Sequence, residues 1–316
     1  MPGASQATAF APASVGNVGV GFDLLGHALE GVGDRVTVAR GATDNGIRIL
    51  GIRRDGQRVD LPLQPEANTA TRGLLRFQRD QRLPALNVTI EKGIPLGSGM
   101  GSSAASAVAA VVAANALLEV PLPREALLDY ALEGERVASA AVHADNVAPS
   151  LFGGLVLCPT WDLPRVTRLP VPAELCCVLI HPHLSVHTRE ARALLTPEVP
   201  MGRLVEQAGR LAGVITGCYT GDVSLIAAHL SDVVVEPQRA HLVTGFTDVK
   251  AAALAAGALG SSLSGSGPSV FAWCTRDCAP RVRDAMVDAF ATHRVLCDAW
   301  LSAIDAPGAR VVEQRA

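Results

Sequence analysis

The order of apolar and polar positions in the first half of the chain predicts short strands and amphipathic helices. Apolar-rich runs at 35–39, 47–52 and 86–91 are separated by Gly, Asp and Asn, a pattern typical of strands joined by turns. A strand-like start, ATAFAPASVG, precedes a glycine-rich loop. Over 66–82, apolar residues recur at helical spacing, which predicts an amphipathic helix. A further helix is expected over 124–141, after a Pro-Leu-Pro segment.

The second half again mixes strands and helices. Four prolines between residues 159 and 172 interrupt the pattern, and we place a domain boundary there, which gives domains at 1–165 and 166–316. Because the elements are short and mixed rather than a long β-α-β series, both domains are predicted to be α+β. The expected strands lie at 174–180, 270–274 and 294–302, and the expected helices at 189–195, 202–219, 222–230, 248–256 and 278–292.

The most apolar stretch, 100–118, consists mainly of Ala, Val and Leu. A membrane span needs about 20 strongly apolar residues, whereas this stretch contains Ser and Asn and depends largely on Ala, which partitions weakly. We therefore expect a central helix that is buried on all sides, and no membrane partner. Further along, the segment HADNVAPSLFGGLVLC is expected to lead through a turn into a strand.

Composition narrows the class of protein. Of the 316 residues, 49% are hydrophobic but only 4% aromatic, and this length predicts two domains, each with its own core. The net charge is −3 and no basic cluster appears, which argues against nucleic-acid binding. Seven cysteines without paired metal-binding spacing indicate reduced thiols in a cytoplasmic protein, and no signal peptide is visible over 1–20.

The segment PLGSGMGSSAAS, residues 95–106, has the chemistry of a polyphosphate-binding loop. Gly97, Gly99 and Gly101 leave the main chain bare and tolerate positive φ, so that backbone N–H groups can converge on an anion. A helix beginning after the loop directs further unpaired N–H groups to the same point. The Walker lysine and the dinucleotide GxGxxG spacing are both absent. The alternative is a Gly/Ser linker that happens to precede a helix.

Two groups of residues outside this loop are candidates for binding an amino group or a carboxylate. Near the N-terminus, Ser14, Asn17 and Asp23 offer acceptors for a substrate amine or hydroxyl, but such residues also form ordinary turns. Arg192 in HTREAR and Arg239 in EPQR have the forked guanidinium that suits carboxylates. The alternative for each arginine is a solvated surface charge.

A third group offers ligands for a cation. Glu135 lies upstream of His143, Asp145 and Asn146, and a carboxylate together with a loop serine provides the hard oxygen atoms that magnesium prefers. A solvated helix face followed by a turn is the alternative. The segment SGSGPS at 264–269 is a second Gly/Ser turn, whose backbone either approaches a ligand or only reverses the chain.

Taken in order, these segments resemble the GHMP small-molecule kinases and, within that family, most of all the homoserine kinases. PLGSGMGSSAAS is similar to the family's phosphate motif, and SVGNVGVGFDLLGHAL, HADNVAPSLFGG, HTREAR, EPQR and SGSGPS appear in the family's order. The resemblance covers most of the chain, from residue 9 to residue 272. It departs at Met100, where Leu is usual, and at Ala140 and Ala141, where a Gly-containing pair often precedes the histidine.

The resemblance implies a two-domain α+β fold. Its N-terminal domain would be like domain 2 of ribosomal protein S5, and its C-terminal domain would be ferredoxin-like. It implies transfer of the ATP γ-phosphate to the hydroxyl of L-homoserine, giving O-phospho-L-homoserine for threonine synthesis, with ATP and Mg²⁺ as cofactors. A GHMP kinase for another small alcohol and a non-catalytic ligand sensor of the same fold are the alternatives, and a homodimer is a possible assembly.

The resemblance also implies roles for individual residues. Ser103 and Glu135 match the magnesium ligands, and Asp145 matches the catalytic aspartate of mevalonate-kinase-like members, so these three form the expected catalytic group. Whether Asp145 acts as a base or transfer is direct stays open. The ATP loop would comprise Pro95, Leu96, Gly97, Ser98, Gly99, Met100, Gly101, Ser102 and Ser103. The residues that fall where homoserine kinases contact the amino acid are Asn17, Asp23, His143, Arg192, Arg239 and Gly265.

Overall fold

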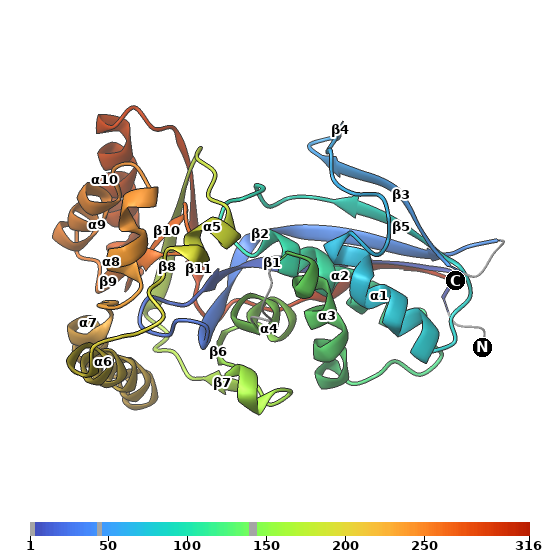
Figure 1. The fold of residues 1–316 in the computed structure, drawn as a ribbon, viewed down its shortest axis with the longest axis horizontal. Helices are drawn as coiled ribbons and strands as arrows, with labels where there is room; N and C mark the ends of the chain where they lie inside the picture. The colour runs from blue at the N-terminus through green and yellow to red at the C-terminus, as the bar shows by residue number, and fades with distance from the viewer. Residues whose placement is uncertain (1–3, 43–45, 139–143) are drawn as a thin grey trace.

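The computed structural model describes residues 4–42, 46–138 and 144–316, which form two mixed α/β domains (Figure 1). The first sheet contains β1 (Gln6–Gly16), β2 (Leu25–Arg40), β3 (Ile47–Arg54), β4 (Gln57–Arg58), β5 (Leu86–Glu91), β6 (Leu155–Leu157), β7 (Thr167–Leu169) and β12 (Arg310–Arg315). Their order is β12-β1-β2-β5-β3-β4, with β6 paired to both β2 and β7. Only the β3–β5 pair of this sheet, among the residues described, is parallel.

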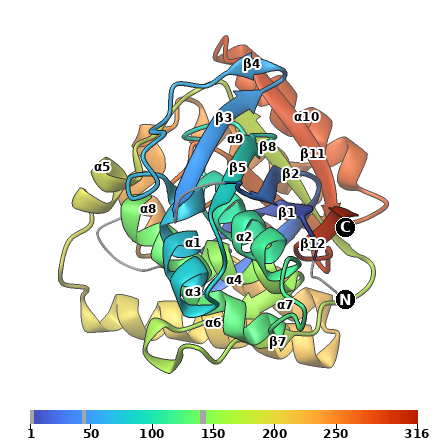
Figure 2. The same cartoon turned by 90° about the vertical axis from the view of Figure 1, so that its right-hand side faces the viewer.

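The helices α1 (Thr69–Asp80), α2 (Ser102–Asn115), α3 (Arg124–Ala138) and α4 (Ala144–Phe152) lie together against the first sheet (Figure 2). Helix α2 is central, because it packs on β1 and β2 and contacts the other three helices. Every residue from 104 to 115 is buried, which confirms the expected central helix. Within the described ranges, no helix is long and apolar enough to cross a membrane.

The second sheet is antiparallel, in the order β11 (Cys297–Ala303), β8 (Leu175–Pro182), β10 (Val270–Thr275) and β9 (Gly260–Leu263). Cys176, Val178 and Ile180 on β8 pack with α9 (Phe246–Ala255) and α10 (Ala279–Thr292), while Cys177 and Leu179 join the main core. Both faces of β8 are covered, in agreement with the unbroken apolar run over residues 175–180. The other helices are α5 (Thr188–Ala193), α6 (Met201–Thr220), α7 (Val223–His229) and α8 (Glu236–Arg239), with short 3₁₀ turns at Thr160–Asp162 and Ala240–Leu242.

Two segments C-terminal to the predicted boundary at 165/166 complete the first sheet. Strand β7 pairs with β6, and the last strand, β12, pairs with β1. Figure 1 shows β12 running back beside the N-terminal strands, and the backbone N–H of Ser5 donates to the carbonyl of Arg315 at 2.9 Å. The chain therefore leaves the first domain after β7 and returns to it at the end, while the boundary itself remains a prediction.

One expected turn is a helix in the structure. The segment HADNVAPSLFGG contains α4, and its expected strand follows as β6. Pro149 inside the helix removes a backbone donor and weakens any helix prediction from sequence. Burial of Val147, Ala148 and Leu151 outweighs this effect, because all three are fully buried in the main core. Residues 139–141 of the helix expected over 124–141 lie outside the described residues.

A buried hydrogen bond joins the two domains. The His27 Nδ1 atom lies 2.9 Å from the Ala28 carbonyl, which can only accept, so this nitrogen carries the proton. The Nε2 atom therefore accepts the indole N–H of Trp273, at 3.2 Å. Burial lowers the pKa of His27 to about 4, since the charged imidazolium would lose its hydration. The neutral side chain of His27 thus links β2 in the first domain to β10 in the second by a hydrogen bond.

Candidate functional site

The glycine-rich segment 95–101 connects β5 to α2 and has the backbone of an anion-binding loop. Gly97, Gly99 and Gly101 have φ angles of 64°, 75° and 68°, the left-handed region that glycine enters without strain. Gly101 immediately precedes α2, and no side chain caps this helix. The first N–H groups of α2 are therefore available to an anion. The Ser102 hydroxyl oxygen at the same end is buried and forms no hydrogen bond with a described residue.

The carbonyl groups of the loop are held by other parts of the protein. The Ser264 hydroxyl donates to the Gly99 carbonyl at 2.7 Å, and the backbone N–H of Ser269 donates to the Ser98 carbonyl at 3.1 Å. A side chain at Gly99 would come within 2.5 Å of the Ser264 carbonyl oxygen, so the two backbones are in close contact. The SGSGPS turn of the second domain therefore braces the phosphate loop of the first.

A cavity of about 270 Å³ runs between the two domains beside this loop. Both domains contribute to its wall, and clefts between domains are common sites of small-molecule binding. Its described lining includes Asn17, Phe22, Asp23, Leu61, Thr69, Lys92, Leu96, Gly97, Ser98, Gly99, Gly101, Ser102, Ser103, Glu135, Asp145, Asn146, Val186, Thr188, Arg192, Arg239, Gly265 and Ser266.

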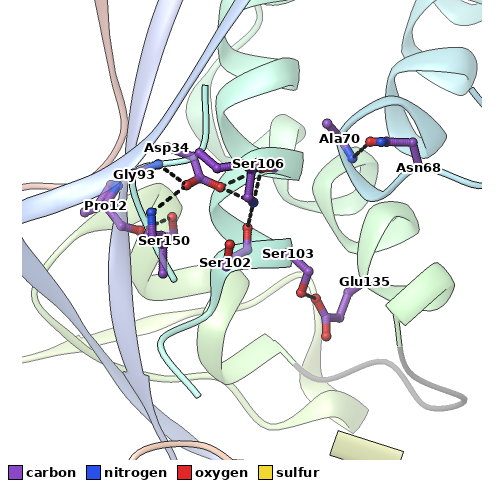
Figure 3. Close-up of polar contacts among 12 residues, drawn as sticks. Pro12, Asp34, Asn68, Ala70, Gly93, Ser102, Ser103, Ser106, Glu135 and Ser150 are labelled. Carbon is purple, nitrogen blue, oxygen red and sulfur yellow. Dashed lines mark hydrogen bonds and ion pairs between the residues drawn. The ribbon is translucent and has the colours of Figure 1, made fainter. Parts of the chain in front are cut away.

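Ser103 in the first turn of α2 and Glu135 on α3 meet at this cavity. The Ser103 hydroxyl donates to Glu135 Oε2 at 3.1 Å (Figure 3). The two residues are 32 positions apart in the sequence, and the packing of α3 on α2 brings them together. A carboxylate and a hydroxyl in contact provide hard oxygen ligands of the kind that magnesium prefers.

Asp145 lies in the first turn of α4, only 2% exposed, beside the N-terminal loop. Its Oδ2 atom accepts the backbone N–H of Asn17 at 3.0 Å. The Asn17 side chain in turn donates to the Gly265 carbonyl at 2.9 Å and accepts the backbone N–H of Asp23 at 3.0 Å. These contacts place Asn17, Asp145 and Gly265 in one network that links the two domains. The expected substrate residue His143 lies outside the described residues.

Two arginines of the second domain enter the cavity opposite Asp23. The Arg192 Nη2 atom lies 2.7 Å from both carboxylate oxygens of Asp23. Arg239 is 3% exposed, and its Nε donates to the Ala191 carbonyl at 3.0 Å. Burial and the nearby charge of Arg192 lower the pKa of Arg239. Both guanidinium groups lie over the Phe22 ring, each 5.2 Å from its centroid.

The cavity is thus lined both by a loop suited to a polyphosphate and by charged side chains suited to a group that bears both charges. Models of the GHMP kinases N terminal domain and the GHMP kinases C terminal region match residues 68–154 and 214–292. A homoserine kinase of Xylella fastidiosa is 50% identical over 313 residues, which cover 98% of this chain and 95% of that protein. The chain belongs to the GHMP kinases.

Other relatives of this GHMP kinase support the same family assignment. A homoserine kinase of Chlorobium phaeobacteroides is 41% identical, over 96% of this chain and 99% of the relative. The crystal structure of homoserine kinase from Cytophaga hutchinsonii is 41% identical, covers 98% of each chain and superposes with a TM-score of 0.93. The crystal structure of L. major mevalonate kinase, 14% identical with a TM-score of 0.70, shares the fold. The expected two-domain GHMP kinase fold is confirmed.

Sequence reasoning missed three residues of the site. Phe22 gave no signal beyond being a lone aromatic in a glycine-rich loop, yet both arginines lie over its ring. Ser264 was part of a recognised turn, but its bond to the phosphate loop crosses 165 positions. Lys92 lies just before the phosphate loop, and its rarity was a usable signal, because the chain has only two lysines.

Proposed function

We propose that this GHMP kinase transfers the γ-phosphate of ATP to the side-chain hydroxyl of L-homoserine, giving O-phospho-L-homoserine. The observation that carries the proposal is the cavity between the domains, which is lined by a phosphate loop and by a paired carboxylate and arginines. Relatives named homoserine kinase that match over almost the whole chain support this substrate. The product would serve threonine synthesis.

The nucleotide end uses the backbone of the phosphate loop and of α2. The loop glycines allow its N–H groups to approach the phosphates, and the N-terminus of α2 adds a partial positive charge. Ser102, the first residue of α2, lines the same wall. Such positioned donors stabilise charge that develops on the transferred phosphoryl group, which accounts for much of the catalysis in phosphoryl transfer.

Ser103 and Glu135 are the residues that would hold Mg²⁺. Their oxygens are already in contact, they line the cavity, and their chemistry fits a hard cation. When bound, the ion would neutralise phosphate charge and orient the terminal phosphate. The protein's own contribution is to keep a carboxylate on α3 within reach of the first turn of α2.

The amino-acid end recognises a zwitterion. Asp23 would take the ammonium group, and Arg192 and Arg239 the carboxylate. In this structure, Asp23 and Arg192 neutralise each other, so a ligand carrying both charges can replace the pair without leaving either group unpaired. An alcohol without these two charges cannot do so, and this favours an amino acid over a sugar or mevalonate.

Asp145 lines the same cavity, and we assign it to the hydroxyl proton. It either accepts that proton during transfer or stabilises a hydroxyl that loses its proton afterwards. Asp145→Asn distinguishes the two roles, because removal of a base should lower kcat by about 100-fold or more. Direct transfer would leave most of the activity in place.

The proposed substrate is tested by an ADP-release assay with homoserine, mevalonate, galactose and shikimate under the same conditions. We expect turnover with homoserine to exceed turnover with the other three by at least about 100-fold in kcat/KM, since only homoserine satisfies both charged groups. Turnover of another alcohol together with no turnover of homoserine would overturn the proposal.

A further inference from the structure

Lysine is almost absent from this chain. Of the 27 basic residues, 25 are arginine and two are lysine, Lys92 and Lys250. Each lysine forms an ion pair, Lys92 with Asp34 in the interior and Lys250 with Glu236 at a partly exposed position. A chain that uses arginine at nearly every other cationic position has lysine where a compact ammonium with three donors is needed.

The ammonium of Lys92 directs all three of its donors at specific acceptors. It donates to Asp34 Oδ2, to the carbonyl of Ser102 at 2.9 Å and to the hydroxyl of Ser106 at 2.7 Å. Lys92 is 5% exposed and follows β5 directly. It also lines the cavity. Lys92 therefore holds the start of α2, directly after the phosphate loop, through its hydrogen bonds to Ser102 and Ser106.

Asp34 lies on β2, is fully buried, and accepts hydrogen bonds from residues at the other end of the phosphate loop. Its Oδ1 atom accepts the backbone N–H of Gly93 at 3.0 Å and of Ile94 at 3.2 Å (Figure 3). Its Oδ2 atom accepts the Ser106 hydroxyl at 2.6 Å, as well as Lys92. A single ion pair thus joins the residues that enter the phosphate loop to those that leave it.

Stability alone is a weak reason for such a pair. Burying two charges costs free energy that their attraction only partly offsets, and apolar replacements of similar size are often as stable. A cation below a helix N-terminus is also unfavourable unless an anion accompanies it. In return, the pair restrains a helix start that Gly101 leaves without a side-chain cap and that has no acidic residue in its first turn.

We propose that Asp34 and Lys92 are positioning residues for the nucleotide, because they hold the two ends of the phosphate loop at the separation that its bound conformation needs. This inference rests on the proposed role of the loop in binding ATP. It predicts that loss of the pair weakens nucleotide binding even where the fold is intact, while homoserine binding at the other end of the cavity is spared.

The test compares Lys92→Met, Asp34→Asn and the double variant by Tm, by KM for ATP at saturating homoserine, and by KM for homoserine at saturating ATP. Lys92→Met should lower Tm most, because it leaves Asp34 buried without its cation. The double variant should regain most of that Tm and still show a KM for ATP raised about tenfold or more. Its KM for homoserine should stay within about twofold of wild type. A loss of folded enzyme alone would lower kcat and leave both KM values unchanged.

The matched control is the double variant Glu236→Gln with Lys250→Met, which removes the chain's other lysine ion pair, in the second domain. It should leave the KM for ATP at the wild-type value. If the Asp34/Lys92 double variant does not fold, Ser106→Ala keeps both charges but removes their shared hydroxyl, and its KM for ATP should rise about two- to fivefold.

A folded Asp34/Lys92 double variant with a wild-type KM for ATP would overturn the inference. So would an unfolded double variant together with an unchanged KM for ATP in Ser106→Ala. Failure of the proposed function has a different signature, because the wild-type enzyme would then not phosphorylate homoserine. In that case, calorimetric binding of ADP to the wild type and the double variant still measures the effect of the pair, and equal affinities would contradict it.

Discussion

Replacement of Arg239 by methionine should weaken homoserine binding sharply, whereas the stability of the folded protein should stay close to that of the wild type. Arg239 is 3% exposed, and it forms no ion pair within 4 Å with a described residue. Burial and the neighbouring Arg192 both lower its pKa, so its charge is unfavourable in the free protein. The carboxylate of the substrate would relieve this cost.

The magnitude follows from the contacts. A charge-assisted hydrogen bond to a carboxylate contributes about 1.5–3 kcal/mol, which corresponds to a rise of about 10- to 150-fold in KM for homoserine. Methionine replaces the apolar stem of Arg239 but loses the bond to the Ala191 carbonyl, which costs about 1 kcal/mol. Because the variant also removes a poorly solvated charge, we expect Tm to change by no more than a few degrees.

The assay measures ADP release against homoserine, against ATP, and against 3-amino-1-propanol, which is homoserine without its carboxylate. Wild type and Arg239→Met should turn over this analogue almost equally, since neither enzyme has a carboxylate to bind. KM for ATP should stay near wild type, because Arg239 lies on α8 of the second domain and contacts Ala191 and Phe22 rather than the phosphate loop. Equal impairment with homoserine and with the analogue would refute the assignment, as would a parallel rise in KM for ATP.

Substitutions of Glu135, Ser264 and His27 test three other contacts. Glu135→Gln should lower kcat strongly and shift its magnesium dependence to higher concentration, and an unchanged magnesium titration would identify Glu135 as an ordinary residue of the helix face. Ser264→Ala should raise KM for ATP about two- to tenfold, because it loses the bond to the Gly99 carbonyl, and a change confined to homoserine would contradict this role. His27 has a pKa of about 4 in the folded protein and about 6.5 in the unfolded chain. As the pH falls, the unfolded chain therefore binds the extra proton first. The free energy of unfolding should decrease between about pH 6.5 and pH 4, by up to about 3 kcal/mol. His27→Gln, measured by Tm from pH 7 to 4, should show a shallower decline, and an identical slope would refute it.

Local sequence was informative wherever the chemistry itself is local. The phosphate loop could be predicted because three alternate glycines and a following apolar run have a conformational meaning that depends only on their neighbours. The buried helix α2 and the strand β8 could be predicted in the same way, because each has a continuous apolar run. The turn predicted over HADNVAPSLFGG was wrong because Pro149 dominates the local preference, whereas the packing of α4 in the core decides the outcome.

What the sequence by itself determined was therefore the set of chemical parts: a phosphate loop, carboxylates, and arginines suited to an anion. Tertiary structure decided which parts meet. Ser103 meets Glu135 through helix packing, Arg192 meets Asp23 across 169 positions, and Lys92 meets Asp34 because β2 and β5 pair. Strand β12 carried no apolar pattern because all its residues are exposed, and only pairing with β1 defines it. Such contacts depend on sheet register and helix packing, which sum weak interactions over the whole chain and leave no signal in any single segment.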